Sequence, residues 1–144
     1  MSSTLQFIPY YDYPATNCID DNLFNLCHTE TQSSPWLSIR IPGGTPTEPA
    51  SSVGHVIIYN RHDMGQDRLS PFQIWVGQSP GDRNSATSQA CGVDNQIVPA
   101  VYGPFAFDCR GITGWYVTIV LPGGNRILNP VSYTHLTLPT SDLV

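Results

Sequence analysis

The chain contains no lysine, and its six positive charges are all arginines. Charged residues make up only 12% of its 144 residues, about half the usual share, and the formal net charge is -5. An acidic chain without a cluster of basic residues is not expected to bind nucleic acid. Runs of about 18 apolar residues are also missing, so we expect no membrane-spanning segment.

The sequence also lacks any sustained 3.6-residue hydrophobic period with capping residues, so no long helix is expected. Its 12 glycines and 13 prolines are instead typical of a loop-rich β protein of one domain. Strands are predicted by β-branched and aromatic runs at residues 36–41, 53–60, 72–76, 97–101, 105–109, 114–121 and 126–128. They indicate an all-β, antiparallel, jelly-roll-like β-sandwich with ligand-binding loops at one end.

Two strands carry clearer information than the rest. Leu37, Ile39 and Ile41 alternate with polar residues, which is typical of a strand buried on one face. Residues 115–121 are almost continuously apolar and predict a central strand. Loops are expected at residues 42–49 and 80–89, which are rich in Gly, Pro and small polar residues.

The most informative loop lies between two of these strands and contains Arg61, Asp63 and Arg68. An aspartate between two arginines can fix both guanidinium planes through charge-assisted hydrogen bonds. The remaining N–H donors then point outward at fixed angles, which suits a neutral polyol such as a sugar. The alternative is a salt-bridged hairpin without a ligand.

The order of several motifs resembles the F-type lectins (fucolectins). These domains belong to the galactose-binding-like superfamily, which includes discoidin and coagulation factor 5/8 type C domains. The resemblance is carried by residues 17–22, 27–29, 35–36, 58–69, 72–77 and 114–117, and by Cys91 and Cys109. It covers about residues 15–129.

The resemblance implies a sugar site made by a histidine followed by an R-x-D-x4-R loop. Arg61, Asp63 and Arg68 match that loop in residue type and spacing, and His28 is the candidate histidine. Many members of the family carry two adjacent cysteines after the aspartate, where this chain has Met64 and Gly65. Fucose or galactose is the expected terminal sugar.

A structural calcium ion is also implied by the resemblance. Asn17, Asp20 and Asn22 match the calcium loop of the family, and calcium prefers six to eight oxygen ligands. In the family, residues near the C-terminus of the domain complete the site. An ordinary Asn/Asp turn is the alternative interpretation.

The four cysteines allow three pairings. The resemblance implies a disulfide between Cys91 and Cys109. The usual family partner of Cys27 lies in the last strand, beyond residue 129, and we therefore expect Cys27 to pair with its neighbour Cys18.

The two ends of the chain raise separate expectations. Disulfides favour an extracellular or secreted protein, whereas the N-terminus lacks the features of a signal peptide. We therefore expect Met1 to be an internal methionine or the start of a fragment. Residues 131–140 match the translation of a transposon-type sequencing adapter, so we expect a domain at 1–129, truncated in its last strand, and a non-native tail at 130–144.

A non-catalytic carbohydrate-binding module is the function we predict. The chain carries no phosphate loop, nucleophile elbow or zinc motif that would indicate an enzyme. The expected partner is a glycan or glycoprotein, with oligomers or tandem repeats supplying avidity. The alternative is a discoidin-like adhesion or targeting domain that binds protein or lipid, as part of a larger extracellular protein.

Overall fold

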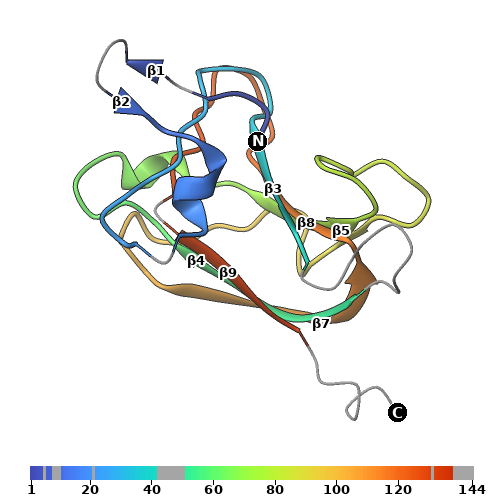
Figure 1. Cartoon of the computed structure of the whole chain (residues 1–144). Coiled ribbons are helices and arrows are strands. Elements are labelled where there is room, and N and C mark those ends of the chain that lie inside the picture. Colours follow the sequence, from blue (N-terminus) through green and yellow to red (C-terminus); the bar gives the residue numbers. More distant parts are fainter. Residues whose placement is uncertain (5, 8–10, 21, 42–50, 131, 138–144) are drawn as a thin grey trace.

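A computed structural model shows two antiparallel sheets facing one another (Figure 1). It describes residues 1–4, 6–7, 11–20, 22–41, 51–130 and 132–137, with only the backbone of residues 6–7, 11–12 and 133–137. One sheet has the order β3 (Trp36–Arg40), β8 (Tyr116–Val120), β5 (Gln73–Gly77) and β6 (Gln89–Ala90). The other has the order β7 (Phe105–Gly114), β4 (Ser51–Tyr59) and β9 (Ser132–Thr137).

The remaining elements are short. β1 (Gln6–Phe7) and β2 (Tyr11–Asp12) form a separate pair. Within the described part of the chain, the helical segments are two 3-10 turns, η1 (Ala15–Cys18) and η2 (Gln66–Arg68). No helix in these segments is long and apolar enough to cross a membrane. The predicted all-β sandwich is therefore confirmed.

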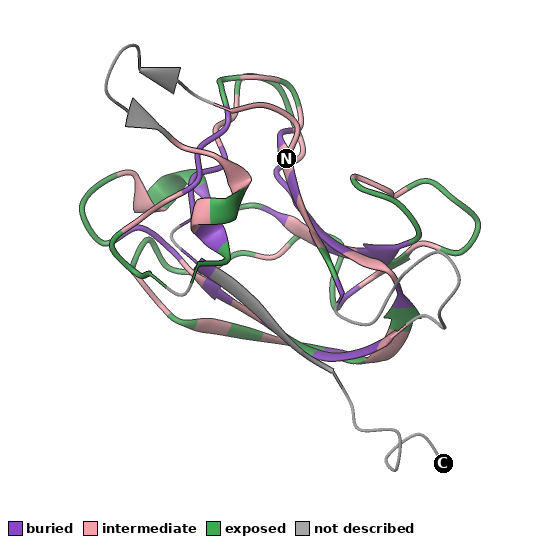
Figure 2. Ribbon diagram, viewed as in Figure 1, coloured by how far each residue is buried: buried purple, intermediate pink, exposed green. Residues whose placement is uncertain are grey.

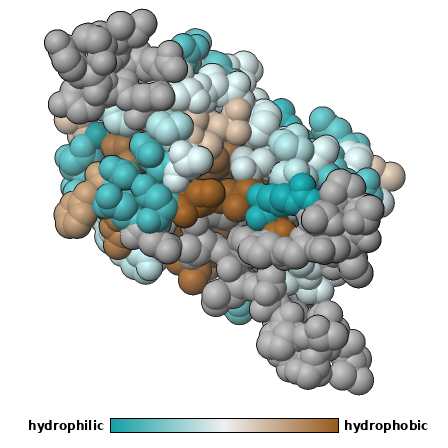
Figure 3. All heavy atoms as spheres, viewed as in Figure 1, coloured by the Kyte–Doolittle hydropathy of each residue, from teal (hydrophilic) through white to brown (hydrophobic). Residues whose placement is uncertain are grey.

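The core lies between the two sheets, where the inward sides of their strands are buried (Figure 2). In β5, Ile74 and Val76 are buried and alternate with the more accessible Gln73 and Trp75. Burial of one such aliphatic side chain contributes about 1.5–3 kcal/mol. On the face drawn in Figure 3, strongly apolar atoms gather near the centre, next to hydrophilic ones.

β8 lies between β3 and β5, as predicted for the apolar run, and its last four residues are buried. The predicted end of the preceding strand at residue 109 is wrong, because β7 continues to Gly114. The chain then crosses to the other sheet and begins β8 at Tyr116. A Cβ at Gly114 would lie 2.7 Å from Val76 Cγ1 and 2.9 Å from the Gly77 carbonyl oxygen. Only glycine allows so close a crossing.

Two other predicted strands do not form. Residues 97–101 make a loop in which Ile97 and Val101 are exposed. The residue before this loop, Gln96, forms an isolated bridge with Phe72. Pro99 interrupts this apolar run and has no N–H to donate to a neighbouring strand. Residues 126–128 contribute an isolated bridge from Arg126 to Gln32.

Two sequence predictions are not tested by the fold. The loop expected at residues 42–49 lies outside the described residues. β9 pairs with β4 through residues 132–137, within the segment predicted to be a non-native tail. That prediction concerns the origin of the sequence, so the pairing of β9 does not decide it.

The strand directions gather several loops at one end of the sandwich. The chain leaves β4 at Tyr59 and enters β5 at Gln73 and β7 at Phe105 at this end, whereas β3 and β5 finish at the other (Figure 1). The loop at residues 60–72 therefore lies at the end expected to bind a ligand.

Candidate functional site

The loop that follows β4 is held at its base by the buried Asn60. The Asn60 backbone N–H donates to the Tyr102 carbonyl and its side-chain amide donates to the Gln66 carbonyl, both at 2.8 Å. Its amide oxygen accepts from the Arg61 N–H at 2.9 Å. These bonds fix the direction in which Arg61 leaves the strand.

Arg61 and Asp63 form the bidentate ion pair that their spacing suggested. Arg61 Nε donates to Asp63 Oδ1 at 2.8 Å, and Nη2 donates to Oδ2 at 2.5 Å. Arg61 is only 8% exposed, whereas the Asp63 side chain is 50% exposed. The hydrogen bonds from Arg61 hold the pKa of Asp63 well below its usual value. Asp63 is therefore ionised at neutral pH and locks the plane of the Arg61 guanidinium.

Arg68 lies at the end of η2, and its side chain packs directly against Gly65. A Cβ at Gly65 would lie 3.1 Å from Arg68 Nε and 3.2 Å from Cδ, and Gly65 has a φ of +69°. Both observations favour glycine at this position. The Gly65 that stands in place of the second family cysteine thus lets the exposed Arg68 side chain fold back across the loop.

Arg126 was not predicted to take part in the site, yet it ties down the end of this loop. Its Nη1 donates to the carbonyls of Pro71 at 2.5 Å and Pro122 at 3.1 Å. Its Nη2 donates to the Arg68 carbonyl at 3.1 Å and the Ser70 carbonyl at 2.9 Å. Nothing in the sequence pattern distinguishes this arginine, because its partners are backbone carbonyls.

Asn129 is a second residue that the sequence analysis missed. It is 3% exposed, and its amide oxygen accepts from both Arg61 Nη1 and Arg68 Nη1 at 3.2 Å. The amide is oriented in this way because the opposite orientation would set its NH2 group against two donors. The two predicted arginines therefore converge on one buried oxygen.

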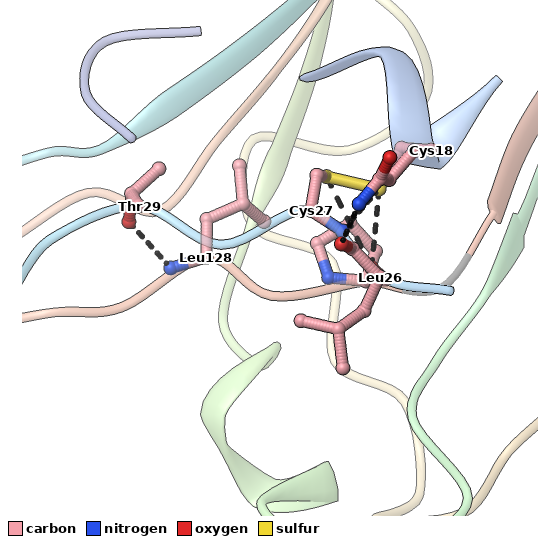
Figure 4. Close-up of a disulfide and its surroundings, with 7 residues drawn as sticks. Cys18, Leu26, Cys27, Thr29 and Leu128 are labelled. Carbon is pink, nitrogen blue, oxygen red and sulfur yellow. Dashed lines mark hydrogen bonds between the residues drawn. A yellow bond between two sulfur atoms is a disulfide. The ribbon is translucent and has the colours of Figure 1, made fainter. Parts of the chain in front are cut away.

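His28 is placed by the disulfide between Cys18 and Cys27, which forms as expected (Figure 4). The next residue, Thr29, pairs with Leu128 through Leu128 N–H to Thr29 Oγ1 at 3.0 Å and Thr29 N–H to the Leu128 carbonyl at 2.9 Å. His28 thereby comes close enough to Arg61 and Arg68 for their charges to act on it. The second expected disulfide, between Cys91 and Cys109, is also present.

The protonation state of His28 follows from its surroundings. Its Nδ1 lies 2.6 Å from the Thr29 carbonyl oxygen, which can only accept, so Nδ1 carries the proton. Burial lowers the pKa of His28, the bond to Thr29 opposes this, and the nearby Arg61 and Arg68 lower it further. The ring is therefore neutral at pH 7, and Nε2 is an acceptor beside two groups that only donate.

Aromatic side chains border the arginine loop. The His62 ring contacts Phe24 edge-on at 6.2 Å and Tyr102 at 5.7 Å between centroids, and Tyr102 contacts Tyr59 at 5.6 Å. Phe24 is 89% exposed. An apolar surface of this kind can pack on the C–H face of a ligand.

The turn predicted to bind calcium has a regular hydrogen-bonding pattern. Asp20 Oδ1 accepts from the Asn22 N–H at 2.9 Å, Oδ2 accepts from the Asn25 amide at 2.7 Å, and the Asn17 amide donates to the Leu26 carbonyl at 3.1 Å. Within the described residues no three His, Cys, Asp or Glu side chains gather to hold a metal. Carboxylate and amide oxygens such as those of this turn are ligand types that calcium prefers.

Comparison with known proteins extends this picture, although no protein-family model matches the chain. A fucolectin from striped bass (Morone saxatilis) serum superimposes with a TM-score of 0.71 and 25% identity, over 92% of this chain and 45% of that one. The lectin domain of lectinolysin, solved with Lewis b antigen, gives a TM-score of 0.73 and 19% identity, over 96% of this chain and 90% of that one. The chain therefore has the fold of the F-type lectins, within the galactose-binding-like superfamily.

A relative in sequence is the pentraxin fusion protein of Xenopus laevis, 30% identical over 97 residues. These residues are 67% of this chain, and the match spans only 21% of that protein. The two solved structures compared above are lectins, and others that the chain resembles are carbohydrate-binding modules. This similarity confirms the prediction of a non-catalytic module.

Proposed function

We propose that this domain binds a terminal sugar such as fucose or galactose through His28, Arg61, Asp63 and Arg68. The observation that carries the proposal is the convergence of two guanidinium groups on Asn129, with one of them locked by Asp63. One lectin that the chain resembles is named a fucolectin, and another was solved in complex with Lewis b antigen. This similarity supports a sugar as the ligand.

The chemistry of the site suits a neutral polyol. Sugar hydroxyl and ring oxygens accept hydrogen bonds, which the remaining N–H groups of Arg61 and Arg68 can donate at fixed angles. His28 Nε2 supplies an acceptor for a sugar hydroxyl. Because Asp63 offsets one of the two positive charges, the site is less suited to a multiply charged anion. Phe24 is placed to contact the apolar face of the sugar.

A glycan array followed by calorimetry with free L-fucose and D-galactose tests this proposal. We expect the wild-type domain to bind glycans with terminal fucose or galactose, and Arg68→Ala to abolish that binding without unfolding the domain. Arg83→Ala is the matched control, because it removes an arginine from the loop between β5 and β6. Glycan binding by Arg68→Ala at wild-type strength would refute the assignment.

We further propose that the turn containing Asn17, Asp20 and Asn22 holds a structural calcium ion. Asp20 is the one carboxylate of the three, and hydrogen bonds from Asn25 and Asn22 lower its pKa, so it is ionised at neutral pH. Millimolar calcium is expected to raise the Tm by at least about 4 °C relative to EDTA. The shift should disappear in Asp20→Asn and persist in Asp94→Asn; an identical Tm with calcium and EDTA would exclude the ion.

The setting of the domain is proposed on the same basis. Two disulfides in a small chain fit an extracellular or secreted protein with a glycoprotein partner. A shallow site of this kind binds one sugar weakly, so oligomers or tandem domains would supply avidity. Analytical ultracentrifugation would give the oligomeric state.

A second candidate function, adhesion to protein or lipid, is favoured by one observation. Phe24, Met64, Ile97 and Val101 are exposed apolar residues on loops at the arginine end. Membrane binding through such residues normally needs supporting cations, and of the arginines at this end Arg61 is already paired with Asp63. Co-sedimentation with lipid vesicles, together with a blank glycan array, would favour this alternative.

A further inference from the structure

Asn129 occupies a special place in the proposed site, because it is the buried point at which the two arginines meet. Arg61 and Arg68 are seven residues apart on one loop, whereas Asn129 comes from a separate segment near the end of the described chain. Its amide oxygen accepts from Nη1 of both arginines at 3.2 Å. At 3% exposure, the amide is too deep to offer a ligand much contact.

The segment that carries Asn129 is itself tied to two other parts of the site. Arg126 binds the Arg68 and Ser70 carbonyls at one end of the arginine loop. Leu128 pairs with Thr29, next to His28. The position of Asn129 is therefore set without the side chains of Arg61 and Arg68, so its oxygen is a fixed point for both guanidinium groups.

The two guanidinium groups carry like charges and would separate if nothing held them. The partial negative charge of an amide oxygen attracts both without neutralising either. We propose that Asn129 is a positioning residue: its side-chain oxygen holds Arg61 Nη1 and Arg68 Nη1 at one point and so sets the spacing of the donors that meet the sugar. This inference rests on the proposed function, but its structural part can be tested without a ligand.

The test compares Asn129→Leu, which keeps the side-chain volume but removes the acceptor, with Asn129→Asp, which keeps an acceptor. In the sugar-free protein, ¹⁵N NMR at low temperature should resolve separate Nη signals for Arg61 and Arg68, since held guanidinium groups rotate slowly. Asn129→Leu should merge the Arg68 signals, whereas those of Arg61, which Asp63 also holds, stay resolved. Asn129→Asp should retain both sets. Asn84→Leu, in the loop between β5 and β6, is the control and should behave as wild type.

Affinity for the best glycan should fall at least tenfold in Asn129→Leu and stay within about threefold of wild type in Asn129→Asp. Circular dichroism would establish that each variant folds. Resolved Arg68 Nη signals in Asn129→Leu would overturn the inference whatever the array shows. Equal glycan affinity of folded Asn129→Leu and wild type would also overturn it. A wild-type domain that binds no glycan would instead refute the proposed function, while the NMR comparison still decides whether Asn129 holds the arginines.

Discussion

The two ends of the sandwich differ in how their arginines are held. At the end opposite the arginine loop, Arg40 lies over the Tyr116 ring at 5.8 Å, and its Nη1 reaches the Tyr116 hydroxyl at 3.4 Å. Arg61 is instead bound by a carboxylate through two hydrogen bonds and by the Asn129 oxygen. The contacts described for Arg40 are thus with a single ring, whereas Arg61 has its guanidinium plane fixed.

The surface hollows are larger at the end where the arginine is less firmly held. Hollows of about 310 and 390 Å³ flank Trp115 at the Arg40 end, while the one beside Arg68 and Arg126 measures about 260 Å³. Size alone would favour the Trp115 end as a ligand site. Pre-oriented donors favour the other end, because a ligand there does not have to immobilise the side chains that bind it. We therefore expect fixed geometry to be a better guide than volume to a shallow binding site.

The largest expected difference in glycan affinity is between the variants Arg61→Ala and Arg40→Ala, one at each end. Arg61→Ala is expected to lose at least about 100-fold in glycan affinity, roughly 2.8 kcal/mol, because it removes donors and leaves Asp63 and Asn129 without their partner. Arg40→Ala should bind within about twofold of wild type. Calorimetry on both variants, after circular dichroism, gives the measurement. If Arg40→Ala proved the weaker binder, the assignment of the ends would be reversed.

Two glycines provide a comparison of intermediate size. Gly65 and Gly81 both have positive φ, and a Cβ at Gly81 would lie 2.9 Å from the Trp36 ring. Each change to alanine should cost about 1–3 kcal/mol in stability through backbone strain. Only Gly65→Ala should also weaken glycan binding, by about tenfold, because it displaces the Arg68 side chain. Chemical denaturation and calorimetry measure the two effects separately, and equal binding by both variants would argue against a role for Gly65.

The smallest expected effect is a dependence on pH. The pKa of His28 is lowered in the folded protein, so the stability it contributes is present above its unfolded pKa of about 6.5 and is lost as the pH falls through the folded pKa. Glycan binding should weaken over the same range, because protonation removes the Nε2 acceptor and adds a charge beside Arg61 and Arg68. Asp63 stays ionised throughout, since its pKa lies far lower.

Binding measured from pH 7.5 to pH 5 would test this, with two histidine variants for comparison. His28→Gln should show a flat profile, whereas His62→Gln, which changes the exposed neighbour of Arg61, should keep the wild-type slope. A wild-type slope in His28→Gln would assign the pH dependence to another group.

The candidate site was only partly predictable. Arg61, Asp63 and Arg68 lie within eight residues of one another, so their spacing carries information that can be recognised without the fold. Arg126 and Asn129 belong to a segment that the strand pattern described only as the start of a strand, and their roles depend on contacts across more than 50 residues. Local sequence patterns do not indicate contacts between residues so far apart in the chain.

The strands show the same division. The apolar runs of β3, β5 and β8 determined which residues are buried, because alternation and β-branched composition are local properties. The run at residues 97–101 has similar composition, yet it pairs with no strand of the described chain. The nearest pairing is the isolated bridge of the preceding residue, Gln96. Strand formation needs a partner, and the partner is chosen by the whole fold.

The sequence by itself therefore determined an all-β sandwich, the resemblance to F-type lectins and the arginine loop with its aspartate. Only the tertiary structure decided how His28 and the two arginines meet, because they are brought together by the Cys18–Cys27 disulfide and by the segment carrying Arg126 and Asn129. The physical reason is that a binding site needs donors at fixed relative positions. Sequence specifies the donors, and packing between distant segments specifies the positions.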